Sequence, residues 1–125
     1  MTVSNRDRIG RALDVAQAAL SPYVERELQA AHGRGWRSQP QVQAALARRG
    51  EPAAQAEALD VQSICDLMRD QWQAVFARRL GVFERNLVHE LSQIRNNWAH
   101  QQAFTTDDAY RALDTIARLL TSVGA

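Results

Sequence analysis

The chain has 125 residues, a mass of 14.0 kDa and a formal net charge of +1. This length suits one domain with its own core, and hydrophobic residues make up 46% of it. No apolar run approaches the roughly 18–20 residues of a membrane-spanning helix, and the first residues lack the apolar segment of a signal peptide. The near-neutral charge does not indicate a general affinity for nucleic acid.

Cysteine and arginine usage bounds the chemistry further. Cys65 is the single cysteine, which excludes an internal disulfide and is typical of a protein of the reducing cytoplasm. We therefore expect a cytoplasmic location. All 15 basic residues are arginine. Each cation is therefore a planar guanidinium that is able to bind a carboxylate or a phosphate through two hydrogen bonds.

The first predicted helix begins at a cap on Ser4 or Asn5. Its apolar residues recur every three or four positions, which indicates one buried face: Ile9, Leu13, Ala16, Leu20, Val24 and Leu28. Pro22 predicts a kink or a short restart within this pattern. Gly33 and Gly35 predict its end.

Residues 33–59 are predicted to be an irregular insertion with short helices. Trp36 is expected to anchor this segment on the bundle. A short helix over Gln41–Arg49 is expected to begin at Pro40 and end at Gly50.

Three further helices follow. Asp60 is expected to cap a helix that runs to Leu80 and ends at Gly81, with one apolar stripe: Val61, Ile64, Cys65, Met68, Trp72, Val75 and Phe76. The next helix begins near Val82, with a seam of Phe83, Leu87, Leu91, Ile94 and Trp98. The last follows a cap at Thr105 to Asp108, and its predicted face is Ala109, Leu113, Ile116, Leu120 and Val123.

These elements predict an all-α fold, with a bundle of four main helices and a shorter insertion after the first. Neither a shift in composition nor an internal repeat divides the chain, so residues 1–125 are expected to form a single domain. We interpret it as the N-terminal module of a longer protein.

One stretch carries more polar chemistry than a core requires. Arg95, Asn96, Asn97 and His100 crowd into six positions. On a continuous helix, Arg95 and His100 are separated by about 140° and about 7.5 Å of rise. They converge only if the helix ends between them, or if two chains bring their copies together across a two-fold axis.

A converging pair would suit cleavage of RNA without a metal. A neutral histidine could take the proton from a ribose 2′-hydroxyl. An arginine could hold the scissile phosphate and stabilise the charge that develops on it. Asn96 could donate a hydrogen bond to a phosphate oxygen or orient His100.

A purely structural interpretation remains open for the same residues. Arg95 could form an ion pair with an acid such as Glu90, and His100 could cap the end of the helix. The spacing itself is weakly specific, because Arg26 precedes His32 by six positions, although Glu27 beside it would repel phosphate.

Other kinds of site fail on their residues. His89-Glu90 resembles the start of the zinc-protease motif, but Gln93 stands where the second histidine is needed. The three histidines and one cysteine are too scattered for a metal site, and we expect no metal and no cofactor. Cys65 lies on an apolar stripe and is expected to be inert core.

The segment Arg95–His100 resembles the signature of the HEPN superfamily: an arginine, a polar residue, three to five further residues and a histidine. Similarity to one branch of the superfamily extends over SNRDRIGRALD, the segment around Trp72, and RNNWAHQQAFTTDDAYRALDTIARLL. That branch occurs fused to an RNA-surveillance endonuclease in eukaryotes and at the N-terminus of large predicted ATPases of bacterial phage-defence islands. The similarity covers most of the chain and is strongest from about residue 60.

This resemblance implies an antiparallel four- to five-helix bundle that forms two-fold dimers, with the motifs of both chains lining one cleft. Active members are metal-independent endoribonucleases. By this match Arg95 and His100 form the catalytic pair, Asn96 is their polar companion, and Asn97 is assigned to RNA binding. Two hypotheses follow: a homodimeric endoribonuclease in bacterial defence or RNA processing, or a non-catalytic dimerisation or RNA-binding module of a larger defence ATPase.

Overall fold

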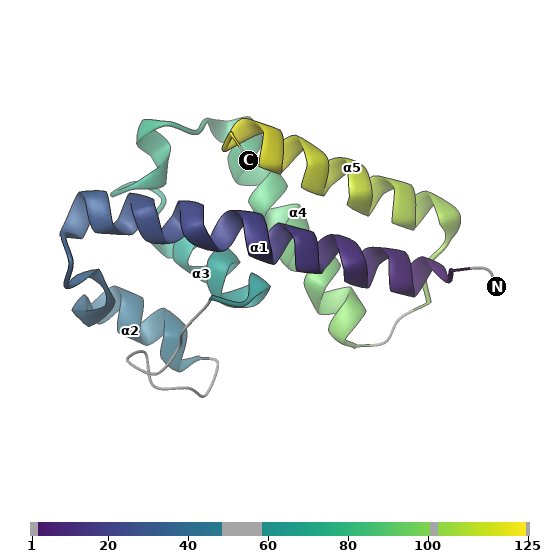
Figure 1. Cartoon of the computed structure of the whole chain (residues 1–125), viewed down its shortest axis with the longest axis horizontal. Helices are drawn as coiled ribbons and strands as arrows, with labels where there is room; N and C mark the ends of the chain where they lie inside the picture. The colour runs from purple at the N-terminus through teal and green to yellow at the C-terminus, as the bar shows by residue number, and fades with distance from the viewer. Residues whose placement is uncertain (1–2, 49–58, 101–102, 125) are drawn as a thin grey trace.

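Helices make up most of the described part of the chain. The computed structural model describes residues 3–48, 59–100 and 103–124, and no strand occurs among them. Figure 1 shows the arrangement of the helices: α1 (Asn5–His32), η1 (Trp36–Ser38), α2 (Pro40–Ala47), α3 (Val61–Asp70), η3 (Phe76–Arg78), α4 (Val82–Ala99) and α5 (Thr106–Ser122). α1 and α5 run side by side in one direction, and α4 runs in the opposite direction. The prediction of an all-α antiparallel bundle of four to five helices is confirmed.

α1 forms much as its sequence predicts. The Ser4 hydroxyl accepts the N–H of Asp7 at 3.0 Å and caps the first turn. All six residues of the predicted stripe are buried. The helix does not restart at Pro22 but continues through it, with the proline exposed. It ends at Gly33, whose φ of 83° suits a residue without Cβ, and the Gly33 N–H donates to the Gln29 carbonyl at 2.7 Å.

The segment after α1 is tied to the bundle by Trp36 and by a buried glutamine. Trp36 is buried in η1, as predicted. Gln71 lies 2.9 Å from Nε2 of His32 and donates its amide to Gln41 at 2.7 Å. α2 begins at Pro40, as predicted. The predicted end of that helix, at Arg49 and Gly50, lies outside the described residues, as does most of the connection that follows.

The third helix is shorter than predicted. Asp60 caps α3 by accepting the N–H of Ser63 at 2.7 Å, but α3 ends at Asp70 instead of running to Leu80. The Ala77 N–H then donates to the Trp72 carbonyl, five residues back, at 2.7 Å. Such bonds widen the turn and break the α-helix. All residues of the predicted stripe are nonetheless buried. The prediction of which residues are buried was therefore right, and the predicted length of the helix was wrong.

α4 and α5 differ from prediction in which apolar residues they bury. Phe83, in the first turn of α4, is 55% exposed. Leu113 is also exposed. The buried face of α5 is rotated from the predicted one and consists of Ala109, Ala112, Thr115, Ile116 and Leu119. The predicted cap is confirmed, since the Thr105 hydroxyl accepts the N–H of Asp108 at 3.0 Å.

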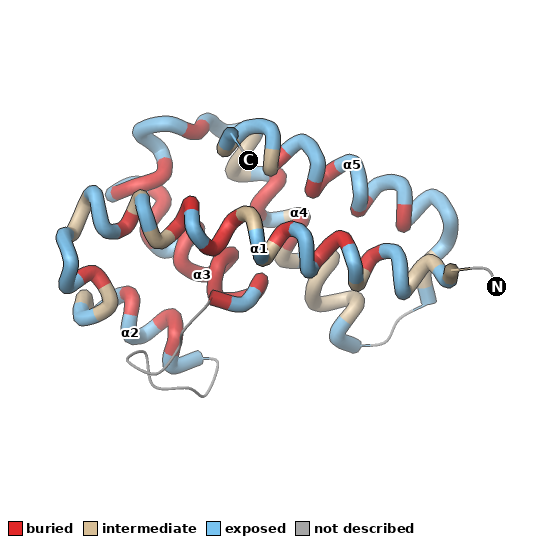
Figure 2. Tube along the Cα trace, in the orientation of Figure 1, coloured by how far each residue is buried: buried red, intermediate tan, exposed pale blue. Residues whose placement is uncertain are grey.

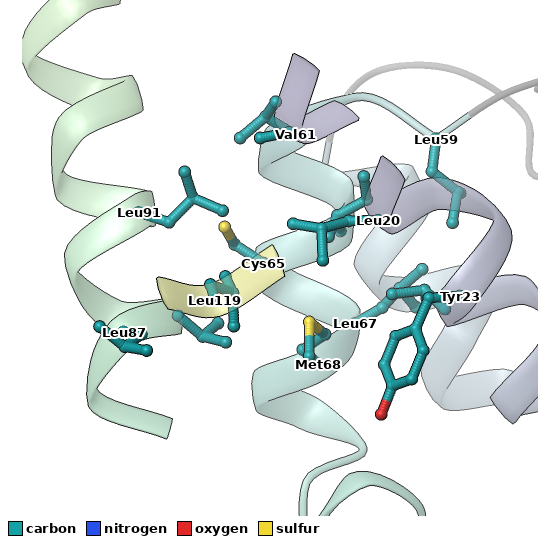
Figure 3. Close-up of a cluster of buried hydrophobic side chains, with 14 of the residues drawn as sticks. Leu20, Tyr23, Leu59, Val61, Cys65, Leu67, Met68, Leu87, Leu91 and Leu119 are labelled. Carbon is teal, nitrogen blue, oxygen red and sulfur yellow. The ribbon is translucent and has the colours of Figure 1, made fainter. Parts of the chain in front are cut away.

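The buried faces of the helices turn toward one another, as the tube in Figure 2 shows. The centre of the core joins three helices: Leu91 of α4, Cys65 of α3 and Leu119 of α5 lie close together in Figure 3. Burial of these apolar side chains is the main favourable contribution to folding. It fixes α4 in the bundle, and α4 carries the candidate site at its C-terminal end.

Candidate functional site

The polar cluster lies at the end of α4, and its histidine is the last residue on the helical path. α4 ends at Ala99. His100 follows as the C-cap, with its N–H donating to the Asn96 carbonyl at 3.0 Å and with φ −85° and ψ 9°. Its Cα therefore still continues the helix. The helix ends one residue before His100, too late to turn His100 toward Arg95, so this ending does not meet the first of the two conditions for their convergence.

Helix geometry then decides which of these side chains share a face. Arg95 and His100 are five positions apart, so they point in directions about 140° apart. Asn96 and His100 are four positions apart and lie on the same face, one turn from each other. Within one chain, the backbone brings Asn96 and His100 together and does not bring Arg95 to them.

The exposure and contacts of the four residues differ. Arg95, Asn96 and Asn97 are half-buried, and His100 is exposed. Asn97 accepts a hydrogen bond from the Gln93 amide at 3.1 Å. Among the residues that the structure describes, Arg95 has neither a hydrogen-bond acceptor nor an ion-pair partner. A half-buried guanidinium with unused donors is well suited to bind an anion.

The structure bears on the two purely structural roles considered for Arg95 and His100, an ion pair with Glu90 and a helix cap. Glu90 pairs with Arg111 of α5 at 2.5 Å, so the predicted ion pair of Glu90 with Arg95 is wrong. His100 does cap α4, through its backbone. Its imidazole has no hydrogen-bond partner in the described part of the chain. The cap therefore leaves the ring free for another role.

The other arginine–histidine pair of similar spacing is part of the scaffold. His32 bonds to Gln71 at 2.9 Å, and the Arg26 guanidinium lies 5.8 Å from the centroid of the Tyr23 ring. His32 therefore joins the end of α1 to the segment after α3, and Arg26 packs on a side chain of its own helix.

Asn97 faces a different environment from Asn96. It lines a hollow of about 330 Å³ between α4, α5 and the start of α1. Glu90 and Asp108 also line this hollow, together with Arg111, which is paired with Glu90. Two carboxylates beside one paired cation would repel a phosphate. The surroundings of Asn97 are therefore unfavourable for binding a phosphate of RNA.

The end of α4 is fixed to the start of α1 through Trp98. The Arg6 guanidinium donates to the Trp98 carbonyl at 2.7 Å, and the Trp98 indole N–H donates to the Arg6 carbonyl at 3.2 Å. The Arg6 guanidinium also lies 4.6 Å from the centroid of the Trp98 ring. Sequence reasoning missed Arg6, because the two residues are 92 positions apart and no local pattern connects them.

Replacing Gly10 with leucine is expected to displace Trp98. A Cβ on Gly10 would lie 3.2 Å from the indole nitrogen, so a larger side chain overfills the contact. We expect a loss of about 1–3 kcal/mol in the free energy of unfolding. Urea denaturation measures this loss, and the indole N–H resonance of Trp98 reports its displacement.

Ala18→Leu is the matched control, because Ala18 is exposed on the same helix. It should leave the stability within about 0.5 kcal/mol of the wild type. Equal effects of the two leucines would contradict the packing of Trp98 on Gly10.

Cys65 is buried, as expected of a core residue. Burial raises the pKa of its thiol from about 9 to about 12, with Asp66 adding to the rise and Arg95 opposing it. A thiol with this pKa stays protonated at neutral pH and is a poor nucleophile.

The raised pKa of Cys65 predicts a loss of stability in alkali. Above pH 9 the unfolded chain releases the thiol proton while the folded chain keeps it, so the free energy of unfolding falls as the pH approaches 12. The fall is up to about 1.4 kcal/mol per pH unit. Urea unfolding of the wild type and of Cys65→Ala should show a stability difference that shrinks between pH 8 and pH 10.5. A difference that stays constant with pH would contradict the shift.

Two kinds of site are absent from the described residues. In residues 3–48, 59–100 and 103–124, no three histidine, cysteine, aspartate or glutamate side chains are grouped closely enough to hold a metal ion. None of the helices in these ranges is both long enough and apolar enough to cross a bilayer.

The chain is thus an all-α bundle that carries Arg95, Asn96 and His100 at the end of α4. The family model described as Swt1-like HEPN matches residues 11–124, and the chain belongs to this family. No curated protein and no solved structure matched the chain.

Proposed function

We propose that the chain is a metal-independent endoribonuclease that acts as a homodimer, with Arg95 and His100 as its catalytic residues and Asn96 beside them. The proposal rests on the exposure and the missing partners of Arg95 and His100, in a chain that belongs to a HEPN family. Arg95 is a half-buried cation without a partner among the described residues, and His100 presents a free imidazole at the end of α4.

The different directions of Arg95 and His100 favour a site shared between two chains. A two-fold axis near the end of α4 would place Arg95 of one chain opposite His100 and Asn96 of the other. Each dimer would then hold two identical composite sites. Asn97 is a secondary candidate for RNA binding in this arrangement.

The chemistry follows from the two side chains. The neutral imidazole of His100 takes the proton from the ribose 2′-hydroxyl, and the 2′-oxygen attacks the phosphorus. Arg95 stabilises the negative charge that builds on the phosphate oxygens, and Asn96 donates a hydrogen bond to one of them. The bond to the 5′-oxygen breaks, and this oxygen takes a proton from water. The products are a 2′,3′-cyclic phosphate and a 5′-hydroxyl.

The test is cleavage of structured and single-stranded RNA in EDTA, with analysis of the product ends and measurement of the mass in solution. The proposal expects cutting by a dimer, with cyclic phosphate ends. Cutting that requires added metal, or linear phosphate ends formed directly, would contradict it.

The alternative is a non-catalytic dimerisation or RNA-binding module of a larger defence ATPase. The structural task of His100 as the cap of α4 favours it, because this task alone explains a residue at that position. It expects no cleavage of any RNA, while the dimer persists. The remaining parts of the proposal are a cytoplasmic location, a bacterial defence or RNA-processing role, and residues 1–125 as a single domain.

A further inference from the structure

A buried glutamine on α3 has an acceptor without a donor. Gln62 is 8% exposed. Its amide nitrogen donates to Asp66 at 3.1 Å and to Ser92 of α4 at 3.3 Å. Its amide oxygen is buried and has no hydrogen-bond partner among the residues that the structure describes. An unpaired buried acceptor costs about 1–3 kcal/mol and therefore needs a reason.

The orientation of the Gln62 amide is fixed by its neighbour. Asp66 is 4% exposed, and its carboxylate only accepts hydrogen bonds when ionised. A flipped amide would place the Gln62 oxygen against this carboxylate and lose the bond. The atom without a partner is therefore the oxygen, and it can be satisfied only by a donor.

Arg95 brings unused donors to the side of α4 that Gln62 contacts. It lies one turn after Ser92 on the same side of α4, and Ser92 contacts Gln62. Its charge also acts on the thiol of Cys65, which lies one turn after Gln62 on α3. An acceptor without a donor and a guanidinium without an acceptor thus meet at one junction between α3 and α4.

We propose that Gln62 is a positioning residue for Arg95: its amide oxygen accepts a hydrogen bond from the guanidinium and directs the remaining donors outward. A neutral amide orients the arginine without cancelling its charge. The nearby carboxylate of Asp66 is already paired with Arg69 at 2.8 Å, so the charge of Arg95 remains available for a phosphate. The consequence for RNA rests on the proposed function, but the contact itself does not.

The contact is tested by solution NMR on the free protein, from the rate at which the Arg95 Nε–H proton exchanges with water. In the wild type it should exchange more slowly than that of the exposed Arg11. In Gln62→Leu it should exchange about fivefold faster than in the wild type, as expected for the loss of one hydrogen bond. Ser92→Ala removes the hydrogen bond between Gln62 and Ser92 and should leave the rate unchanged.

Gln62→Glu provides a second variant, should the leucine disturb the fold. It keeps an oxygen for Arg95 and adds a charge, so the Arg95 proton should exchange more slowly than in the wild type. Wild-type exchange as fast as that of Arg11 would overturn the proposal. So would exchange that neither variant alters in the folded protein.

The effect on RNA separates the two proposals. If the protein cleaves RNA, Gln62→Leu should lower kcat/KM about fivefold, and should have no further effect when Arg95 is already alanine. An additive effect in that double variant would overturn the positioning role. If the NMR effect is seen but no RNA is cut, the contact between Gln62 and Arg95 is supported and the proposed nuclease activity is refuted.

Discussion

Replacing His100 with alanine is expected to lower RNA cleavage in EDTA at least about a hundredfold, because a general base contributes about 10²–10⁴ to the rate. The imidazole of His100 is exposed and makes no contact within the described residues. Its removal should therefore leave the fold and the dimer intact. Product formed from end-labelled RNA measures the rate, with circular dichroism and light scattering on the same samples.

His89→Ala is the matched control for that experiment. His89 is an exposed histidine on the same helix, two turns before Asn96. Its loss should leave cleavage within about twofold of the wild type, since no catalytic role is assigned to it. Undiminished cutting by His100→Ala, or an equal loss in both variants, would contradict the role of His100.

The largest effect on stability is expected at Phe76. It is 1% exposed, and its ring lies 6.2 Å from that of Tyr23 and 6.5 Å from that of Trp72, centroid to centroid. Phe76→Ala should lower the free energy of unfolding by about 3–5 kcal/mol. Urea denaturation provides the measurement.

Phe83→Ala is the corresponding control. Phe83 is 55% exposed, although its spacing predicted a core position. Its replacement should cost less than about 0.5–1 kcal/mol. A larger loss at Phe83 than at Phe76 would show that the periodicity of α4, rather than the structure, identifies the buried residue.

Local pattern predicted those features of the fold that depend on local interactions. The buried stripe of α1, the caps at Asp60 and Thr105, and the start of α4 follow from side-chain spacing and hydrogen bonds within one turn. The break after α3 could not be predicted in this way. It contains a backbone hydrogen bond to the carbonyl five residues back, whereas the α-helix uses the carbonyl four residues back. In this segment, the spacing of apolar residues predicted which side chains are buried but not where the α-helix ends.

Tertiary contacts explain the remaining errors. Periodicity does not show which side of a helix its neighbours cover, so Phe83 and Leu113 were placed in the core although both are exposed. Glu90 pairs with Arg111 instead of Arg95, which only the packing of α5 against α4 decides.

The candidate site was predictable in residue type only. Arg95, Asn96 and His100 stand out in the sequence, but the contacts around them come from distant segments. The bond of Arg6 to Trp98 and the approach of Gln62 to Ser92 join residues 92 and 30 positions apart. Neither contact leaves a signal in a single sequence.

The central claim is that Arg95 of one chain acts with His100 of another, and mixed dimers test it most directly. Arg95→Ala and His100→Ala chains are expressed together with different tags, and the dimer that carries both tags is purified. Each parent dimer lacks a complete site. The mixed dimer regains one intact composite site of two, so cleavage in EDTA should return to about half of the wild-type rate. A mixed dimer as inactive as its parents would contradict the shared site.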